Sequence, residues 1–471
     1  MIKKTKIICT QGPATDGEGI IEQLILNGMN CARFNFSHGT HEEHKKRIDA
    51  VKAAAKKTDR VISLILDTKG PEMRLGEFAN GSVQLTAGNK FILTNSDEPG
   101  DETHVSVSHK LLYTEVKPGD KLLLSDGLVE LTVDAIVDKD IHTTILNSGK
   151  MSTRKRVAAP GVALGLPAIS EQDEKDIIFG IENHMDFIAA SFIQRASDVE
   201  ELRKLVARNG GQMEIIPKIE NLAGVQNIDD IIAVSDGIMV ARGDLGVEIP
   251  AEDVPIIQKE IIKKCNAVGK PVIVATQMLE SMTINPRPTR AEVSDVGNAI
   301  WDGADVIMLS GETASGKYPV EATATMSKIA KRVDESIEYE KIFKRQGVQK
   351  MFSQTDAISH ATVQLAYELN AAAIITPTKS GYTTRSVSKY RPQAPIIAFT
   401  PNKQLARHLN LRRGVLAIPN VPILEQEELI AYATKNAVER GIVKEGDVVV
   451  MTSGIKYGMG GTSAIQMLTI E

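Results

Sequence analysis

The chain has 471 residues, of which 42% are hydrophobic and 24% charged, a balance typical of a soluble globular protein with two or three domains. The net charge of −5 provides no general basic surface for nucleic acid, and no apolar run approaches the ~20 residues that a membrane-spanning helix needs. Cys9, Cys31 and Cys265 lie in or beside apolar runs without a C-x-x-C pair, so we expect reduced packing residues of a cytoplasmic protein.

Eight short apolar runs, each ending in polar or glycine residues, organise most of the chain. They cover residues 6–13, 29–37, 61–72, 185–192, 214–221, 236–244, 271–278 and 305–312. Helical spacing between several of them is clearest at 17–28, 40–57 and 198–210. Near-continuous apolar runs indicate strands that are buried on both faces and therefore parallel. Eight such units predict an α/β fold, a (β/α)8 TIM barrel, whose chemistry gathers at the C-terminal ends of the strands.

One connection is far longer than a single helix requires. Residues 71–166 read as short alternating apolar runs with turns at PGD and SDG, which predicts a small inserted β-barrel domain. The barrel itself is then expected to consist of residues 1–70 and 167–340. An insertion after the third strand lies over the barrel mouth, where it could act as a lid.

The chain becomes polar after Asp334, and we expect a connector near residues 339–354. Strand-like runs then return, which predicts a C-terminal α/β regulatory domain over 341–471. The five candidate strands of this domain are 371–378, 394–400, 414–420, 447–454 and 465–470.

Lys218 and Glu220 stand two residues apart at the end of the run 214–221. If this run is a strand, both side chains point to one face and Ile219 points to the other. A cation and a carboxylate then share a small volume at a strand end, which could hold a metal ion beside an anionic substrate. On spacing alone, an ordinary ion pair is the more common explanation.

Longer motifs carry a family resemblance over the whole chain. The strings ICTQGPAT, ARFNFSHG, DTKGPEMR, PKIEN, ARGDLG, ATQMLESM, RPTRAEVSDV and SGETASGKYPVEA together resemble pyruvate kinase. The resemblance implies transfer of the phosphoryl group of phosphoenolpyruvate to ADP, giving pyruvate and ATP, the last step of glycolysis. It also implies a cytoplasmic homotetramer, with no nucleic acid or membrane as partner. Because the sequence ends at Glu471, we expect it to lack the extra C-terminal phosphotransfer-like domain of some bacterial members.

The resemblance assigns roles at the strand ends. It implies Mg²⁺ (or Mn²⁺) on Glu220 and Asp244, since two carboxylates on neighbouring strands can supply oxygen ligands. Lys218 would stabilise the phosphoryl group in flight, and Arg33 would fork onto the phosphate. The implied substrate contacts are those of Arg33, Lys218, Gly243, Asp244 and Thr276. The relay that protonates the pyruvate enolate is implied to contain Thr276, Ser310 and Glu312, although Thr276 alone reads as an ordinary strand residue.

A potassium site and a nucleotide site are also implied. The potassium ligands would be Asn35, Ser37, Asp67 and Thr68. Family members with a glutamate at the position of Glu72 generally depend on K⁺, so we predict K⁺ dependence. The nucleotide contacts would be Asn35, His38, Arg74 and Lys155. The family often reads K-G-V-N-x-P-G where this chain reads KRVAAPG, so the role of Lys155 is the least secure of the four.

The string TPTKSGYT lies between a predicted strand and a predicted helix. Hydroxyls, a lysine and a glycine at a helix start make a phosphate cradle, although a plain helix cap explains the spacing equally well. The resemblance implies that this loop binds a phosphorylated sugar effector. Its residues are Thr378, Lys379, Ser380, Gly381 and Thr383.

Two other functions remain possible. One is a Mg²⁺-dependent lyase or aldolase that makes pyruvate enolate on a similar barrel. The other is an inactive metabolite sensor, which the retained set of catalytic residues argues against. Zinc on His38, His41 and His44 is disfavoured, because His44 would lie off the face that the other two share.

Overall fold

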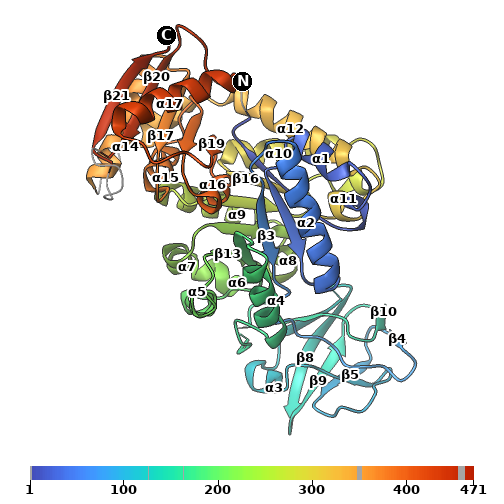
Figure 1. Ribbon diagram of the computed structural model, residues 1–471. Helices are drawn as coiled ribbons and strands as arrows, with labels where there is room; N and C mark the ends of the chain where they lie inside the picture. The colour runs from blue at the N-terminus through green and yellow to red at the C-terminus, as the bar shows by residue number, and fades with distance from the viewer. Residues whose placement is uncertain (1–2, 126, 163, 347–352, 455–461) are drawn as a thin grey trace.

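A computed structural model describes residues 3–125, 127–162, 164–346, 353–454 and 462–471 (Figure 1). A central barrel carries a β-rich insertion at one end and a C-terminal domain at the other. The predicted fold class is confirmed. None of the described helices combines the length and apolarity needed to cross a membrane.

The barrel closes through eight parallel strands in the order β1-β16-β15-β14-β13-β12-β3-β2. All eight fall within the predicted runs. They are β1 (Lys6–Thr10), β2 (Cys31–Asn35), β3 (Ser63–Asp67), β12 (Phe187–Ala190), β13 (Glu214–Ile219), β14 (Ile238–Ala241), β15 (Val272–Ala275) and β16 (Val306–Leu309).

Helices surround the strands. They are α1 (Ile20–Leu26), α2 (His41–Lys57), α4 (Glu171–Glu182), α5 (Ala196–Arg208), α6 (Leu222–Gln226), α7 (Ile228–Val234), α8 (Arg242–Glu248), α9 (Val254–Val268), α10 (Arg290–Asp302), α11 (Gly311–Ala314) and α12 (Pro319–Ser336), with 3-10 turns η1 (Pro13–Thr15) and η2 (Glu280–Thr283). Helix α2 begins after Thr40 because the Thr40 hydroxyl accepts from the Glu43 amide while the Glu43 carboxylate accepts from the Thr40 amide.

Strand β13 shows how the alternation of side chains along a strand places the candidate site residues. Ile216 belongs to the inner core of the barrel, with Phe187 and Met239, whereas Ile215 and Ile219 pack into the outer core against the helices. Lys218 and Glu220 therefore continue the inward face of β13 at its C-terminal end.

The insertion is a curled six-stranded sheet, β11-β7-β8-β9-β5-β6, beside the pair β10-β4. It has its own core, which includes Phe91, Leu122 and Leu131. Its elements are β4 (Ser82–Leu85), β5 (Lys90–Thr94), β6 (His104–Ser106), α3 (Leu112–Glu115), β7 (Lys121–Leu124), β8 (Val129–Val137), β9 (Asp140–Ile145), β10 (Gly149–Ser152) and β11 (Val157–Ala158).

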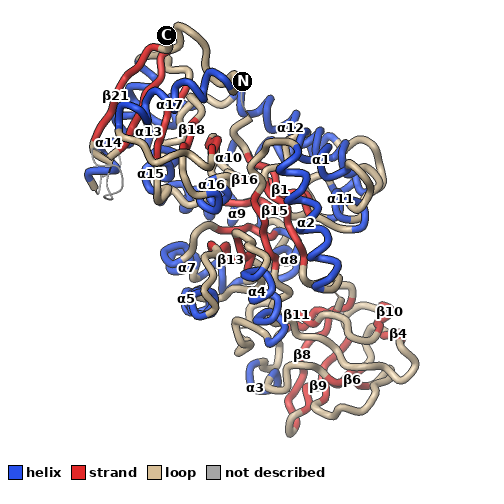
Figure 2. Tube along the Cα trace, viewed as in Figure 1, coloured by secondary structure: helices blue, strands red, loops and turns tan. Residues whose placement is uncertain are grey.

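The C-terminal domain has the five predicted strands in the order β19-β18-β17-β20-β21, all parallel except β21. Helices cover both faces of this sheet (Figure 2). The elements are α13 (Tyr339–Gln346), α14 (Gln354–Glu368), β17 (Ala373–Pro377), α15 (Tyr382–Lys389), β18 (Ile396–Phe399), α16 (Lys403–Leu409), β19 (Val415–Ile418), α17 (Gln426–Glu439), β20 (Val448–Ser453) and β21 (Ala464–Thr469). The expected connector begins as helix α13, because Tyr339 and Phe343, one turn apart, are both buried.

The C-terminal domain also closes the N-terminal end of the barrel. The segment 407–413 comprises the end of α16 and the residues after it, and Leu411 is only 1% exposed within the inner barrel core. We call this segment the barrel floor. Its charged side chains reach buried carboxylates, with Arg407 on Asp186 and Arg413 on Asp334.

Candidate active site

A continuous chain of ion pairs crosses the C-terminal mouth of the barrel. The Nε of Arg33 lies 2.6 Å from Asp67 Oδ2, and the Nζ of Lys218 lies 3.1 Å from Asp67 Oδ1. The same Nζ lies 2.9 Å from Glu220 Oε1. All four side chains are buried or nearly so, and they come from β2, from the end of β3 and from the end of β13.

Burial and charge act on these groups in opposite directions. Burial alone would raise the pKa of Asp67, but Arg33 and Lys218 hold it below its ordinary value. Burial alone would lower the pKa of Lys218, yet the carboxylates of Asp67 and Glu220 hold it above its ordinary value. Burial raises the pKa of Glu220 to about 7, with Lys218 opposing this shift and Asp244 adding to it. Lys218 is therefore held in its charged form, whereas the ionised form of Glu220 would be stabilised by a further positive charge.

Glu220 and Asp244 fit a hard divalent cation. The Oε1 of Glu220 is buried without an aligned hydrogen-bond donor, although Lys218 Nζ is close to it. Glu220 directly follows β13, but Asp244 lies in the first turn of α8 rather than on β14, which ends at Ala241. Mg²⁺ typically takes one or two protein carboxylates and completes its shell with water and substrate oxygens. Two carboxylates, one with an unsatisfied oxygen, match that pattern.

Thr276 directly follows β15 in a left-handed backbone conformation, with φ of 70°. Its hydroxyl accepts from the Gly243 amide at 2.8 Å and donates to the Ala275 carbonyl at 2.6 Å. Arg242 donates to the Thr276 carbonyl at 2.7 Å. A β-branched residue with positive φ is a strained conformation held by its surroundings, so the hydroxyl of Thr276 is fixed beside the Gly243–Asp244 backbone.

Ser310 and Glu312 lie at the end of β16. The two carboxylate oxygens of Glu312 accept from the backbone amides of Leu279 and Ser310, at 3.0 and 2.7 Å. Burial raises the pKa of Glu312. The hydroxyls of Ser310 and Thr283 are both buried, and neither has a hydrogen-bond partner among the described residues. Two unsatisfied hydroxyls mark a place where water or substrate would be stabilised.

The predicted potassium ligands lie at adjacent strand ends, where Asn35 pairs with Asp67 between β2 and β3. Asn35 Oδ1 accepts from the Ser37 amide at 3.2 Å, and both Asp67 oxygens face cationic side chains. The Thr68 carbonyl accepts from the Ser191 hydroxyl at 2.6 Å. The set is rich in oxygen, but several of these oxygens already have partners.

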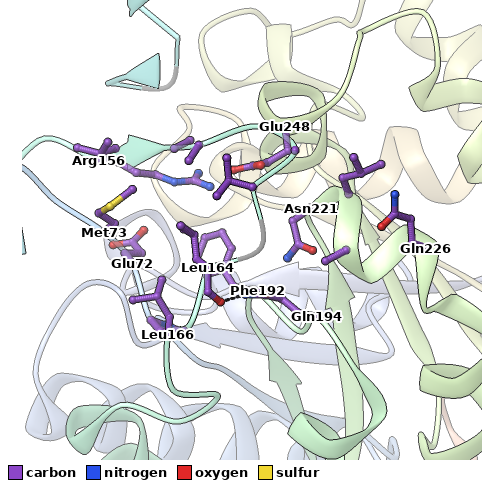
Figure 3. Close-up of a pocket in the computed structure, with 18 residues that line it drawn as sticks. Glu72, Met73, Arg156, Leu164, Leu166, Phe192, Gln194, Asn221, Gln226 and Glu248 are labelled. Carbon is purple, nitrogen blue, oxygen red and sulfur yellow. Dashed lines mark hydrogen bonds between the residues drawn. The ribbon is translucent and has the colours of Figure 1, made fainter. Parts of the chain in front are cut away.

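The predicted nucleotide residues come from two places, with Asn35 and His38 at and after the end of β2 and Arg74 and Lys155 at the two ends of the insertion. His38 and Lys155 are exposed, and Arg74 pairs with Glu72 and donates to the Arg154 carbonyl at 2.9 Å. A pocket opens between insertion and barrel, lined among others by Glu72, Arg156, Phe192, Asn221 and Glu248 (Figure 3).

The three histidines do not gather into a metal site. His41 pairs with the buried Asp176 at 2.6 Å, and His44 stacks on Phe36 and bonds to the His38 carbonyl. Across the described residues, no group of three or more histidine, cysteine or acidic side chains has metal-binding geometry.

Comparison with known proteins decides the family. A family model described as the barrel domain of pyruvate kinase matches residues 2–323, and one for the pyruvate kinase alpha/beta domain matches 356–468. The chain is 50% identical to the pyruvate kinase of Bacillus licheniformis, over 100% of this chain and 81% of that protein. It is also 50% identical to the pyruvate kinase of Clostridium acetobutylicum, over 100% and 99%. A crystal structure of a Cryptosporidium parvum pyruvate kinase superposes with a TM-score of 0.96 at 40% identity, covering 100% of this chain and 96% of that one.

The chain belongs to the pyruvate kinase family. It is thus a phosphotransferase with phosphoenolpyruvate and ADP as substrates and pyruvate and ATP as products. The lyase or aldolase alternative receives no support from these matches. Pyruvate kinases generally need a divalent metal ion and potassium.

In this pyruvate kinase the predicted effector loop is partly committed to internal bonds. Thr378 Oγ1 accepts from the Gly381 amide at 2.8 Å, and Thr383 Oγ1 lies 2.8 Å from Thr462 Oγ1. Gly381 has φ of 81° and precedes α15, and the side chains of Lys379 and Ser380 are exposed. The helix-cap interpretation and the cradle interpretation therefore both describe features of the loop.

Sequence reasoning missed Arg156 of this pyruvate kinase. The string KRVAAPG points to Lys155, but side chains alternate along an extended segment, so the neighbouring Arg156 faces the opposite way. Lys155 is exposed, whereas the side chain of Arg156 is 12% exposed and pairs with Asp244. The alternation itself was the signal that could have identified Arg156.

Proposed function

We propose that Lys218 and Arg33 carry the phosphoryl-transfer step. The ion-pair chain that joins Arg33, Asp67 and Lys218 is the observation that supports this most directly. A buried lysine that stays charged is suited to stabilise a phosphoryl group in flight, because the surrounding low dielectric strengthens its field. Arg33 has a planar fork that can bind phosphate through two parallel hydrogen bonds.

Glu220 and Asp244 are proposed to hold the divalent ion, Mg²⁺ or Mn²⁺. The unsatisfied Oε1 of Glu220 and the raised pKa of that carboxylate support this assignment. When bound, the ion would supply positive charge that offsets the repulsion between phosphoenolpyruvate and the two carboxylates. The backbone of Gly243, next to Thr276 Oγ1, is proposed to orient the substrate carboxylate together with Thr276 and Asp244.

Thr276, Ser310 and Glu312 are proposed to deliver the proton that converts the enolate to pyruvate. The unpartnered Ser310 hydroxyl is the natural place for an ordered water or a proton relay. Glu312 accepts a hydrogen bond from the Ser310 amide, so the proposed contribution of Glu312 is to position Ser310. Thr276 presents its hydroxyl on the neighbouring strand end.

Potassium is proposed on Asn35, Ser37, Asp67 and Thr68, and the nucleotide on Asn35, His38, Arg74 and Lys155. Support for the first comes from the adjacent oxygens at the ends of β2 and β3. Support for the second comes from the exposed side chains of His38 and Lys155. In that reading residues 1–70 and 167–340 form the catalytic unit, 71–166 the lid and 341–471 the regulatory domain.

The loop of Thr378, Lys379, Ser380, Gly381 and Thr383 is proposed to bind a sugar phosphate. The exposed Lys379 and Ser380 at the start of α15 support it. Replacing Ser380 and Thr383 with alanine should remove activation by sugar phosphates, measured as the change in KM for phosphoenolpyruvate. An unchanged response to every sugar phosphate would exclude this loop. The protein is further proposed to work in the cytoplasm as a homotetramer, in line with its family and with its three buried free cysteines.

A lactate dehydrogenase-coupled assay tests the proposal as a whole. Pyruvate formation should require ADP, a divalent metal ion and K⁺, each omitted in turn. Full activity without K⁺ would remove the potassium assignment and the role given to Glu72. Pyruvate formation without ADP would contradict phosphoryl transfer itself.

A further inference from the structure

Arg156 occupies a fixed position where the insertion returns to the barrel. Its carbonyl accepts from the Ser125 amide at 2.9 Å, and its backbone forms an isolated bridge with Arg74. The flanking residues pair as well, since the Leu75 amide donates to the Lys155 carbonyl and the Val157 amide donates to the Met73 carbonyl, both at 2.8 Å. The backbone thus aims the Arg156 side chain away from the solvent that Lys155 faces.

The guanidinium of Arg156 extends toward the cluster of carboxylates at the barrel mouth. Its Nη1 makes an ion pair with Asp244 Oδ1, and its Cζ lies 4.8 Å from the centre of the Phe192 ring. Figure 3 shows the side chain crossing the pocket toward Glu248. The Phe192 amide in turn donates to Glu220 Oε2 at 2.7 Å, so the residue that stacks on Arg156 also binds the second metal carboxylate. Arg156 therefore touches one proposed metal ligand and packs on a residue bound to the other.

The charges at this mouth do not balance without a further cation. Arg33 and Lys218 pair with Asp67 and Glu220. Asp244 pairs with Arg156, and Glu248 lies close enough to both to feel their charges. Burial alone would lower the pKa of Arg156, but Asp244, Glu220 and Glu248 raise it above its ordinary value. The guanidinium thus supplies part of the positive charge that balances these carboxylates.

We propose that Arg156 is a resident cation of the metal site, which competes with the divalent ion for Asp244. The inference rests on the proposed metal role of Glu220 and Asp244. A guanidinium and a divalent cation repel each other at such range, and the same Asp244 oxygen cannot serve both fully.

Binding of Mn²⁺ to the full-length protein without substrates tests this, with free Mn²⁺ measured by electron paramagnetic resonance. Arg156→Gln should tighten Mn²⁺ binding by about three- to ten-fold, since a charge-assisted contact of a partly exposed carboxylate no longer competes. Arg156→Lys keeps the positive charge and should tighten binding less than Arg156→Gln. Arg154→Gln is the matched control, because Arg154 is a neighbouring arginine that is 74% exposed and pairs with Glu77 within the insertion. Its Mn²⁺ affinity should equal that of the parent.

Glu220→Gln separates the inference from the site on which it rests. If Glu220→Gln weakens Mn²⁺ binding but Arg156→Gln leaves it unchanged or weaker, the metal site stands and the competition is refuted. If Glu220→Gln leaves Mn²⁺ binding intact, the proposed metal site itself is wrong. Equal tightening by Arg156→Gln and Arg154→Gln would also refute the inference, since it would reduce the effect to the net charge of the insertion.

Discussion

The two ends of the barrel are both buried and both ionic, but they differ in what is left unsatisfied. At the floor, Asp186, Asp236 and Asp305 each accept a backbone amide from the first two residues of a neighbouring strand, those of Leu64, Ile215 and Val272. Each of these acids also pairs with an arginine, in the order Arg407, Arg203 and Arg391. The floor carboxylates therefore fasten strands and helices together.

At the mouth the carboxylates are less fully paired. Glu220 Oε1 and the Ser310 and Thr283 hydroxyls lack aligned partners, and Thr276 and Phe192 adopt left-handed backbone conformations. Strain and unsatisfied polar atoms cost stability, and a folded protein keeps them where a ligand completes them. Open nitrogens also occur at the floor, on His408 and Arg413, so the two ends differ in their carboxylates. The comparison teaches that a buried carboxylate with its oxygens bonded fastens the fold, whereas one with an oxygen open to a cation marks a place for a ligand.

The largest test of this contrast uses one buried lysine from each end. Lys218→Met should lower kcat by at least about 10²- to 10³-fold, because a buried charge that stabilises the transferring group is lost. Mn²⁺ binding should remain, since Glu220 and Asp244 are intact. Lys6→Met is the control, as Lys6 is buried at the floor with its Nζ 2.6 Å from the Val415 carbonyl, and kcat should stay near that of the parent. Loss of Mn²⁺ binding in Lys218→Met would reduce Lys218 and Glu220 to a plain ion pair.

A substitution of Arg413 tests the floor, where we expect a loss of stability and no loss of activity. Arg413 lies 2.5 Å from Asp334 Oδ1, with both side chains 2% exposed, and it also donates to the Ala304 carbonyl. Arg413→Ala leaves Asp334 buried and unpaired, so we expect a loss of about 3–5 kcal/mol in the free energy of unfolding, measured with urea. The kcat of the folded fraction should not change. Arg440→Ala breaks an exposed pair with Asp59 and should cost less than about 0.5 kcal/mol. Equal losses in the two variants would mean that the floor pair is solvated.

The sequence predicted the mouth better than the floor for a physical reason. The period of two in β13 places Lys218 and Glu220 on one face wherever the strand lies, so the pair is readable locally. Asp244 was expected at a strand end and lies instead in α8, because β14 ends at Ala241 and the helix starts at the next residue. The contact of Arg156 with Asp244 joins residues 88 apart and depends on how the insertion is seated, which no local pattern encodes.

The floor had a signal that the sequence analysis did not use. Acidic residues stand at the start of four predicted runs, as Asp186, Glu214, Asp236 and Asp305, while three arginines and one histidine crowd into 407–413. An acid at the N-terminal end of a buried strand needs a partner, and the basic cluster could supply it. The pairing of each acid with its own cation is long-range and comes only from the fold.

Leu411 tests whether the floor is also an apolar plug. It is 1% exposed among inner barrel residues such as Ile65 and Phe187. Leu411→Ala should lower the free energy of unfolding by about 2–5 kcal/mol through lost burial and a cavity. Leu26→Ala removes a leucine that is 67% exposed and should cost less than about 0.5 kcal/mol. A similarly small cost for Leu411→Ala would place the C-terminal domain loosely against the barrel.

The smallest expected effect concerns protons at the floor. His408 lies 3.7 Å from Glu214, and burial lowers the pKa of His408 to about 4. Because the unfolded chain binds the proton near pH 6.5, His408 costs stability as the pH falls from about 6.5 toward 4. Burial raises the pKa of Asp186 to about 6, which acts in the opposite direction but is common to parent and variant. Between pH 7 and 5 the parent should therefore lose about 2 kcal/mol more unfolding free energy than His408→Asn. Equal losses would mean that His408 also binds a proton in the folded protein, so that the floor accepts a buried positive charge at this position.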